Sequence, residues 1–329
     1  VSSAASDVYK RQIPDMPTAT AEAMARVRVR EIRKRVARGG TAGIHTGLGG
    51  LDRLMGGLRT GSLHVFAARP GMGKTAFALF MAVNAAKQGV PVCVYSLEMS
   101  REQLIFRMLG QIADVEPSKI TKGTATEEEM RALEEASRQL KELPICINQR
   151  SDIQIDEIRC DISLRRRQGK CSLAIIDYLQ LVNRDDKGQT PNEAISNITR
   201  KAKITAMDEE IPIVLLCQLN RNCETRGTYS FRHQLSDLRD SGSIEQDADT
   251  VAFISRLSVV NIHEDPDTHL PTRGRGTILL AKNRQGELGH VRFMHNEGVT
   301  SFWDDTQPAC VRKARAAEPK PEGKGLFEC

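Results

Sequence analysis

The feature that most constrains this chain is the run ARPGMGKT at residues 68–75, which lies between an apolar segment and a helix-forming segment. Residues 63–67 (LHVFA) predict a buried strand, and residues 76–82 (AFALFMA) predict the start of a helix. A strand that enters a glycine-containing turn before a helix N-terminus directs backbone N–H groups toward one point, which favours a polyanion. The run is therefore interpreted as a phosphate-binding loop.

The residues of this loop have separate predicted roles. The Lys74 ammonium is expected to reach the β- and γ-phosphates of ATP, and the Thr75 hydroxyl to ligate Mg²⁺. Ala68 stands where the general pattern has its first glycine, so Gly71 and Gly73 must supply the conformational freedom of the turn. The predicted nucleotide-binding residues of the loop are Arg69, Pro70, Gly71, Met72, Gly73, Lys74 and Thr75.

The composition is typical of a soluble globular protein, because 329 residues with 40% hydrophobic content can bury a sizeable core. No stretch approaches the roughly 18 to 20 apolar residues of a membrane span, and the N-terminus has no apolar secretory region. The eight cysteines include no C-x-x-C pair, and Cys93, Cys146 and Cys217 lie in strand-like runs. We therefore expect reduced thiols, no structural zinc site, no membrane partner and a cytoplasmic location.

The net charge of +5 is distributed unevenly. Residues 1–40 hold nine basic and four acidic residues, residues 306–329 hold five and three, and residues 41–305 hold 33 and 35. The basic excess lies at the two ends, so it says nothing about nucleic acid binding by the central region. Any nucleic-acid surface there must be built locally from particular loops.

Four segments follow from the composition along the chain. Residues 1–12 have no periodicity and are interpreted as a non-native leader. Residues 13–40 form a linker with a basic amphipathic helix, because apolar residues recur at helical spacing between 25 and 36. This helix either docks on another surface or packs on its own domain. Residues 41–305 are the expected ATPase domain, and residues 306–329 a disordered tail.

The predicted elements alternate between strands and helices. Helix starts are signalled by Ser100 with Gln103, by Thr126 with Glu129, and by Thr190 with Glu193. The pattern predicts an α/β fold, a mostly parallel twisted sheet with helices on both faces, and a C-terminal antiparallel hairpin. The expected strands are 62–68, 91–96, 144–149, 172–177, 212–217, 250–256, 277–282 and 289–294.

Three strand ends are expected to meet at the phosphate loop, because ligands of parallel sheets bind at the carboxyl ends of the strands. Asp177 ends a buried strand and is predicted to hold Mg²⁺. Glu98 follows the strand at 91–96 and is the predicted general base, although a helix-start charge is the alternative role. Gln218 ends a third strand and is expected to sense the γ-phosphate.

Two further segments carry cations that this site could use. The polar stretch from 218 to 247 is too long for an ordinary connection, and its arginines could grip a single nucleic acid strand if it is not simply a surface loop. The turn at 282–286 carries Lys282 and Arg284 on a projecting tip. Most such turns are inert, but an ATPase that works at a subunit interface needs cations from a neighbour.

Together these segments resemble the C-terminal, RecA-like ATPase domain of DnaB-type replicative DNA helicases, from about residue 44 to 303. The segments that carry the resemblance are TG at 46–47, LD at 51–52, AARPGMGKT at 67–75, SLEMS at 96–100, IDYLQ at 176–180, SDLRDSGSIEQDAD at 236–249 and AKNR at 281–284. The run at 236–249 is the most diagnostic, since a phosphate loop alone fits many ATPases.

The resemblance implies a homo-hexameric ring with ATP between subunits, single-stranded DNA in the pore and 5′ to 3′ translocation. By position, Lys74, Thr75, Glu98, Asp177 and Gln218 keep the roles given above. Lys282 and Arg284 become a finger pair that acts on the neighbouring subunit. Arg239, Asp240 and Gly242 fall on the DNA-contacting loop, where Asp240 replaces a more usual Glu.

The family's N-terminal domain, which engages primase, has no counterpart in this sequence, so primase and a helicase loader are weaker partner predictions. Two alternatives stay open. One is a RecA-like recombination or loading ATPase that assembles filaments, and the other is a helicase fragment unable to assemble.

Overall fold

The computed structural model describes residues 25–27, 29–30, 33, 42–150, 153–177, 190–219, 233–238, 241–266, 268–296, 298 and 301–305. Contacts divide the chain into two units, Val1–Ala42 and Gly43–Cys329. In the first unit, residues 25–27, 29–30 and 33 are helical and exposed. Their backbone agrees with the predicted basic helix, whose docking role stays a prediction.

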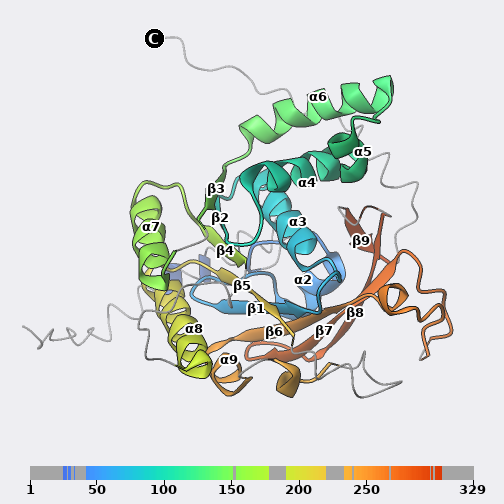
Figure 1. Cartoon of the computed structure of the whole chain (residues 1–329). Coiled ribbons are helices and arrows are strands. Elements are labelled where there is room, and N and C mark those ends of the chain that lie inside the picture. Colours follow the sequence, from blue (N-terminus) through green and yellow to red (C-terminus); the bar gives the residue numbers. More distant parts are fainter. Residues whose placement is uncertain are drawn as a thin grey trace, which may run out of the picture. The chain divides into compact units, whose positions relative to one another are not determined.

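The second unit is built on a sheet that has nine strands in the described part of the chain, in the order β3-β2-β4-β5-β1-β6-β7-β8-β9 (Figure 1). The strands from β3 to β6 in this order run parallel, and β7, β8 and β9 continue the sheet antiparallel. The strands are β1 (Leu63–Ala68), β2 (Val92–Ser96), β3 (Ile145–Gln149), β4 (Leu173–Asp177), β5 (Ile213–Gln218), β6 (Thr250–Ser255), β7 (Arg275–Asn283), β8 (Gly289–His295) and β9 (Phe302–Asp304).

Helices cover both faces of this sheet (Figure 1). The alternation of side chains along β1 sends Val65 to one hydrophobic cluster, with α7, α8 and α9, and Phe66 to another, with α2 and α3. Helix α4 packs against α3 in a third, smaller cluster. The helices are α2 (Gly49–Met55), α3 (Lys74–Lys87), α4 (Arg101–Ala113), α5 (Pro117–Lys122), α6 (Glu127–Glu142), α7 (Ile155–Arg167), α8 (Pro191–Asp208) and α9 (Ser241–Asp247).

The helix starts read from the sequence are confirmed. In each, the side chain at the cap accepts the backbone N–H three residues later, and the backbone N–H of the cap residue donates to the side chain of that later residue. Such a capping box satisfies two backbone donors that a helix start otherwise leaves unpaired. The pairs are Ser100 with Gln103, Thr126 with Glu129 and Thr190 with Glu193.

All eight expected strands are present, and the α/β fold with a C-terminal antiparallel part is confirmed. Strand β9 was not expected. It adds Phe302 to an aromatic cluster around Phe77, whose ring centroid lies 5.4 Å away, and its Asp304 carboxylate accepts the N–H groups of Gly49 and Gly50 at 3.0 and 2.9 Å. A carboxylate at a helix N-terminus is favourable, so β9 fixes the start of α2.

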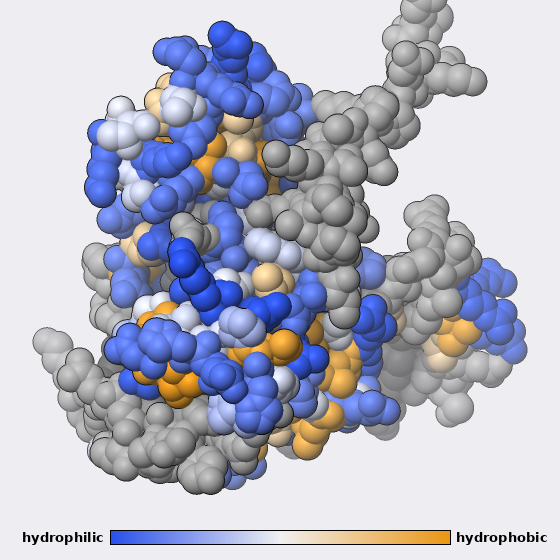
Figure 2. Space-filling model, turned by 90° about the vertical axis from the view of Figure 1, so that its right-hand side faces the viewer, coloured by the Kyte–Doolittle hydropathy of each residue, from blue (hydrophilic) through white to orange (hydrophobic). Residues whose placement is uncertain are grey.

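The side of the molecule on which α5 and β8 lie in Figure 1 is predominantly hydrophilic, and its hydrophobic residues form small separate patches (Figure 2). Within the described ranges, no helix has the length and apolar character needed to cross a membrane. The described cysteines are free thiols, and Cys93, Cys171 and Cys217 are buried.

Candidate functional site

The turn between β1 and α3 has the backbone geometry that the phosphate-loop prediction requires. Gly71 and Gly73 have φ angles of 79° and 89°, a region that side chains other than glycine rarely adopt. Gly73 is also the N-cap of α3 and offers no side-chain acceptor to the first N–H groups of that helix. These N–H groups and the positive end of the helix dipole face the turn, where they favour phosphate oxygens.

Lys74, Thr75 and Asp177 meet at the base of this turn. The Thr75 hydroxyl donates to Asp177 Oδ2 at 2.7 Å, and Lys74 Nζ lies 3.4 Å from Asp177 Oδ1. Asp177 is 2% exposed, and its Oδ1 has no hydrogen-bond donor among the described residues. A hydroxyl beside a buried carboxylate, one oxygen of which has an ion-pair contact but no hydrogen bond, is a ligand set that suits Mg²⁺. The three predicted roles are therefore compatible with one another in space.

Glu98 is held next to this cluster by the turn that follows β2. The Ser96 hydroxyl donates to the Met99 carbonyl at 2.9 Å and accepts the Met99 N–H at 3.3 Å. The Leu97 N–H donates to the Asp177 carbonyl at 2.8 Å, which ties the turn to the end of β4. The Glu98 side chain is exposed and reaches the cavity above the phosphate loop. The carboxylate is thus free to contact a water molecule near a bound nucleotide.

A cavity of about 400 Å³ lies over the loop and brings most of the predicted residues together. Gln218, opposite Ala68 in the β1–β5 register, reaches it from the end of β5. Two of the residues predicted to bind the nucleotide or its metal do not line the cavity: Asp177 lies beneath the loop, beside Thr75, and the Met72 side chain is buried in the core. The predicted residues that line the cavity are Arg69, Pro70, Gly71, Gly73, Lys74, Thr75, Glu98 and Gln218.

Arg256 lines the same cavity and was missed in the sequence. It follows β6, and its Nη1 donates to the Gly71 carbonyl at 3.3 Å. Its Nε lies 3.2 Å from His295 Nε2. Since His295 Nδ1 is 2.7 Å from the Asn296 carbonyl, Nδ1 must carry the proton, and Nε2 accepts from Arg256. Burial lowers the pKa of both side chains. Arg107 of α4 is a second cation that was missed.

Lys282 and Arg284 lie at the opposite end of the sheet. Asn283 of β7 pairs with Thr250 at the start of β6, and Thr250 pairs with His64 near the start of β1. The phosphate loop follows the other end of β1, and six residues at about 3.3 Å each place it roughly 20 Å away. The predicted finger pair therefore lies too far away to contact a nucleotide at the phosphate loop of the same chain.

The sequence suggested that Lys282 and Arg284 project freely from the tip of a turn. In the structure, both side chains are hydrogen-bonded to the same chain. Lys282 Nζ donates to the Glu245 carbonyl, and Arg284 donates to the Gln246 carbonyl, both in the last turn of α9. Arg284 Nη1 also lies 3.4 Å from Asp249 Oδ1. Burial raises the pKa of Asp249, but hydrogen bonds from Lys203 and from the Leu63 N–H, with the charges of Lys203 and Arg284, outweigh it and lower the pKa below 3.8.

Comparison with known proteins identifies the family. A family model, the DnaB-like helicase C terminal domain, matches residues 43–304. The chain belongs to this family. It is similar to the replicative DNA helicases DnaC of Bacillus subtilis and DnaB of Geobacillus stearothermophilus, at 36% identity over 80% of this chain. It spans only 57% of the length of each of these relatives.

Solved structures agree with the family and with the RecA-like fold. The ATPase domain of G40P has a TM-score of 0.77 at 30% identity, and the match covers 86% of this chain and 98% of that domain. A DnaB-like replicative helicase, solved to show its interactions with primase, has a TM-score of 0.76 at 30% identity and covers 86% of this chain and 66% of that one.

Only part of the predicted DNA-binding site of this DnaB-like domain lies within the described residues. Arg239 and Asp240, predicted to contact DNA, lie outside the described residues. Gly242 is described and is exposed in the first turn of α9. Its predicted contact with DNA stays a prediction. Since Lys282 and Arg284 contact the last turn of the same helix, Gly242 and the predicted finger pair lie at the two ends of α9.

Replacing Arg256 with alanine should weaken nucleotide binding by the DnaB-like domain about tenfold, because a hydrogen bond to a charged donor contributes about 1.5–3 kcal/mol. The variant removes the contact with Gly71 that supports the shape of the phosphate loop. Titration with a fluorescent ATP analogue measures the dissociation constant. Arg292→Ala, on β8 outside this cavity, is the matched control. An unchanged dissociation constant in a folded Arg256→Ala protein would remove Arg256 from the site.

Proposed function

We propose that this chain is the ATP-hydrolysing motor of a hexameric replicative DNA helicase that moves 5′ to 3′ along single-stranded DNA. The observation that carries the proposal is the meeting of Lys74, Thr75 and Asp177 beneath a cavity that Glu98 also lines. The similarity to curated replicative helicases supports DNA as the substrate on which the motor acts.

Hydrolysis in this site requires a water molecule, a base and charge compensation. Glu98 accepts the proton of the water that attacks the γ-phosphorus, and the bond to the leaving ADP oxygen breaks. Lys74 and the N–H groups at the start of α3 compensate negative charge on the phosphate oxygens. Thr75 and Asp177 would hold Mg²⁺, which when bound offsets charge on the β- and γ-phosphates.

The connection from nucleotide to DNA runs through the end of β5 in this proposal. Gln218 reaches the cavity from that end, and its amide can hydrogen-bond a γ-phosphate oxygen. The chain continues from β5 toward Arg239, Asp240 and Gly242, the proposed DNA contacts. Loss of the γ-phosphate at Gln218 therefore offers a way to move the DNA-contacting segment after hydrolysis.

The proposal also requires a ring of subunits. Lys282 and Arg284 lie about 20 Å from the phosphate loop of their own subunit, so they compensate charge only on a nucleotide held by a neighbour. A head-to-tail interface of this kind closes into a ring when the rotation between subunits permits it. Contacts with primase or a loader remain predictions that depend on parts of the relatives outside this match.

A strand-separation assay tests this function. The protein, ATP, Mg²⁺ and a forked duplex should give unwinding that depends on the 5′ single-stranded arm, and single-stranded DNA should stimulate ATP hydrolysis. Lys74→Ala is the inactive control. Electron microscopy of the ATP-bound protein should show rings. Filaments that pair homologous strands, with no unwinding of the fork, would overturn the helicase proposal in favour of a recombination ATPase.

A further inference from the structure

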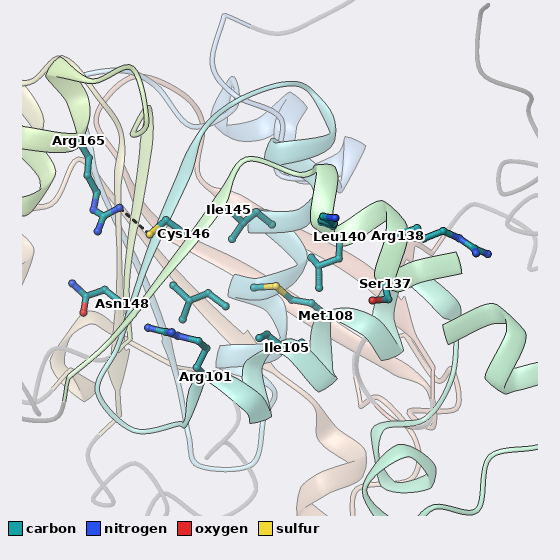
Figure 3. A pocket seen from close by; sticks show the side chains of 12 residues that line it. Arg101, Ile105, Met108, Ser137, Arg138, Leu140, Ile145, Cys146, Asn148 and Arg165 are labelled. Atoms are coloured by element: carbon teal, nitrogen blue, oxygen red, sulfur yellow. Dashed lines mark hydrogen bonds between the residues drawn. The ribbon is translucent and has the colours of Figure 1, made fainter. Parts of the chain in front are cut away.

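A second cavity, of about 860 Å³, lies at the β3 edge of the sheet, where strand β3 and helices α4, α6 and α7 line it (Figure 3). Its floor is apolar. Side chains of α4, α6 and β3 form that floor, and they are Ile105, Met108, Leu140, Ile145 and Ile147. Neither the proposed hydrolysis nor the predicted DNA contacts use any of these residues.

The rim of this cavity is cationic. Arg101, Arg138, Lys141 and Arg165 line the cavity together with these apolar residues, and no acidic side chain lines it. Arg138 and Arg165 each have a carboxylate partner, at 3.0 and 2.7 Å. Arg101 and Lys141 have no carboxylate within 4 Å in the described parts of the chain, so the rim keeps an uncompensated positive charge.

The wall formed by β3 adds a backbone feature. β3 pairs with β2 and ends the sheet, so one row of its N–H and C=O groups has no strand beside it among the described residues. An open strand edge is a template for an added segment of another chain. The residues of β3 are partly exposed, so an incoming backbone can approach this edge.

We infer that this cavity, the β3 groove, binds a partner protein through a short segment that alternates acidic and apolar residues. Apolar side chains of such a segment pack on the apolar floor, and its carboxylates form ion pairs with the cationic rim. The two end segments of this chain have the wrong charge for a cationic rim, because residues 1–40 and 306–329 are both net basic. A small anion is also a poor fit, because the floor offers it no polar group.

A synthetic ten-residue peptide that alternates glutamate with isoleucine or leucine is the probe, and the same peptide with lysine for glutamate is its control. The acidic peptide should bind the full chain and slow maleimide labelling of Cys146, which lines the groove beside Arg165 Nη1 at 2.9 Å. Labelling of Cys160, which is exposed on α7, should not change. Burial raises the pKa of the Cys146 thiol, so the labelling needs mildly alkaline buffer.

Charge reversal gives the second readout. The double variant Arg138→Glu with Lys141→Glu should weaken binding of the acidic peptide at least about tenfold, since rim charges steer association. The matched double variant Arg131→Glu with Lys122→Glu, exposed on α6 and α5, should bind normally. Equal loss in both variants, or no protection of Cys146, would overturn the inference.

The same assay tests the alternative that a basic segment of this chain occupies the β3 groove. If the lysine peptide, or a peptide of residues 21–38, binds as tightly as the acidic one, the groove belongs to a basic segment and the inference is wrong. The assay needs no nucleotide or DNA. Its failure therefore leaves the proposed helicase function untouched, and failure of the helicase proposal leaves it standing.

Discussion

Replacing Glu98 with glutamine should lower the rate of ATP hydrolysis about 10²- to 10⁴-fold, the usual contribution of a positioned general base. The amide keeps the size and exposure of the side chain but cannot accept the proton of the attacking water. Nucleotide binding should persist, because Lys74, Thr75 and the N–H groups at the start of α3 remain. A steady-state ATPase assay and a titration with a fluorescent ATP analogue measure the two effects separately.

The control for this variant is Glu102→Gln, an exposed acid in the first turn of α4. Glu98 precedes the same helix, so a mere helix-start charge at either position would affect stability by a similar small amount. If Glu98→Gln hydrolyses ATP at the parent rate, the base assignment fails. If both variants lose activity equally, the loss reports the start of α4.

The local elements were predictable because their signals are local. Buried parallel strands are short apolar runs, and the Ser or Thr with Glu or Gln pairs mark helix starts by a hydrogen-bond pattern that spans three residues. The approach of Asp177 to Thr75 was also predictable. Asp177 ends β4 and Thr75 follows β1 and the phosphate loop, and parallel strands of one sheet end at a common edge.

The contacts that depend on register between distant segments were not predictable. Lys282 and Arg284 reach the last turn of α9 only because β7 pairs antiparallel with β6, with an irregularity between Val251 and Ala252. No short-range pattern encodes that pairing. Strand β9 is three residues long and follows no apolar run, so its sequence carries too little signal.

Arg256 is a different kind of miss, because a signal was present. It follows the apolar run of β6, as Asp177 ends β4, and the argument that placed Asp177 at the ligand edge applies equally to it. Carboxylate and amide groups were expected at this edge, but an arginine was not. Its contact with Gly71 makes it part of the phosphate loop's support.

The largest effect should come from mixing two inactive variants, Arg284→Ala and Lys74→Ala. Each alone should lose hydrolysis, by about 10³- to 10⁵-fold where a trans arginine is removed. In mixed rings, the interface between two subunits is active when its phosphate loop comes from an Arg284→Ala subunit and its finger from a Lys74→Ala subunit. Equal, random mixing therefore restores activity at up to about a quarter of the subunit interfaces of a closed head-to-tail ring.

This recovery separates a trans role of Arg284 from a structural one. Arg284 also contacts Gln246 and Asp249 of its own chain, so Arg284→Ala could be inactive through a local rearrangement. A neighbour cannot repair such a defect, and mixing would then restore nothing. The control is Lys74→Ala mixed with a double variant that carries both Lys74→Ala and Arg284→Ala. This mixture must stay inactive, since every phosphate loop in it is defective. The ATPase rate of the first mixture is measured against this control in the presence of single-stranded DNA. It decides whether Arg284 acts on the nucleotide that the neighbouring subunit binds.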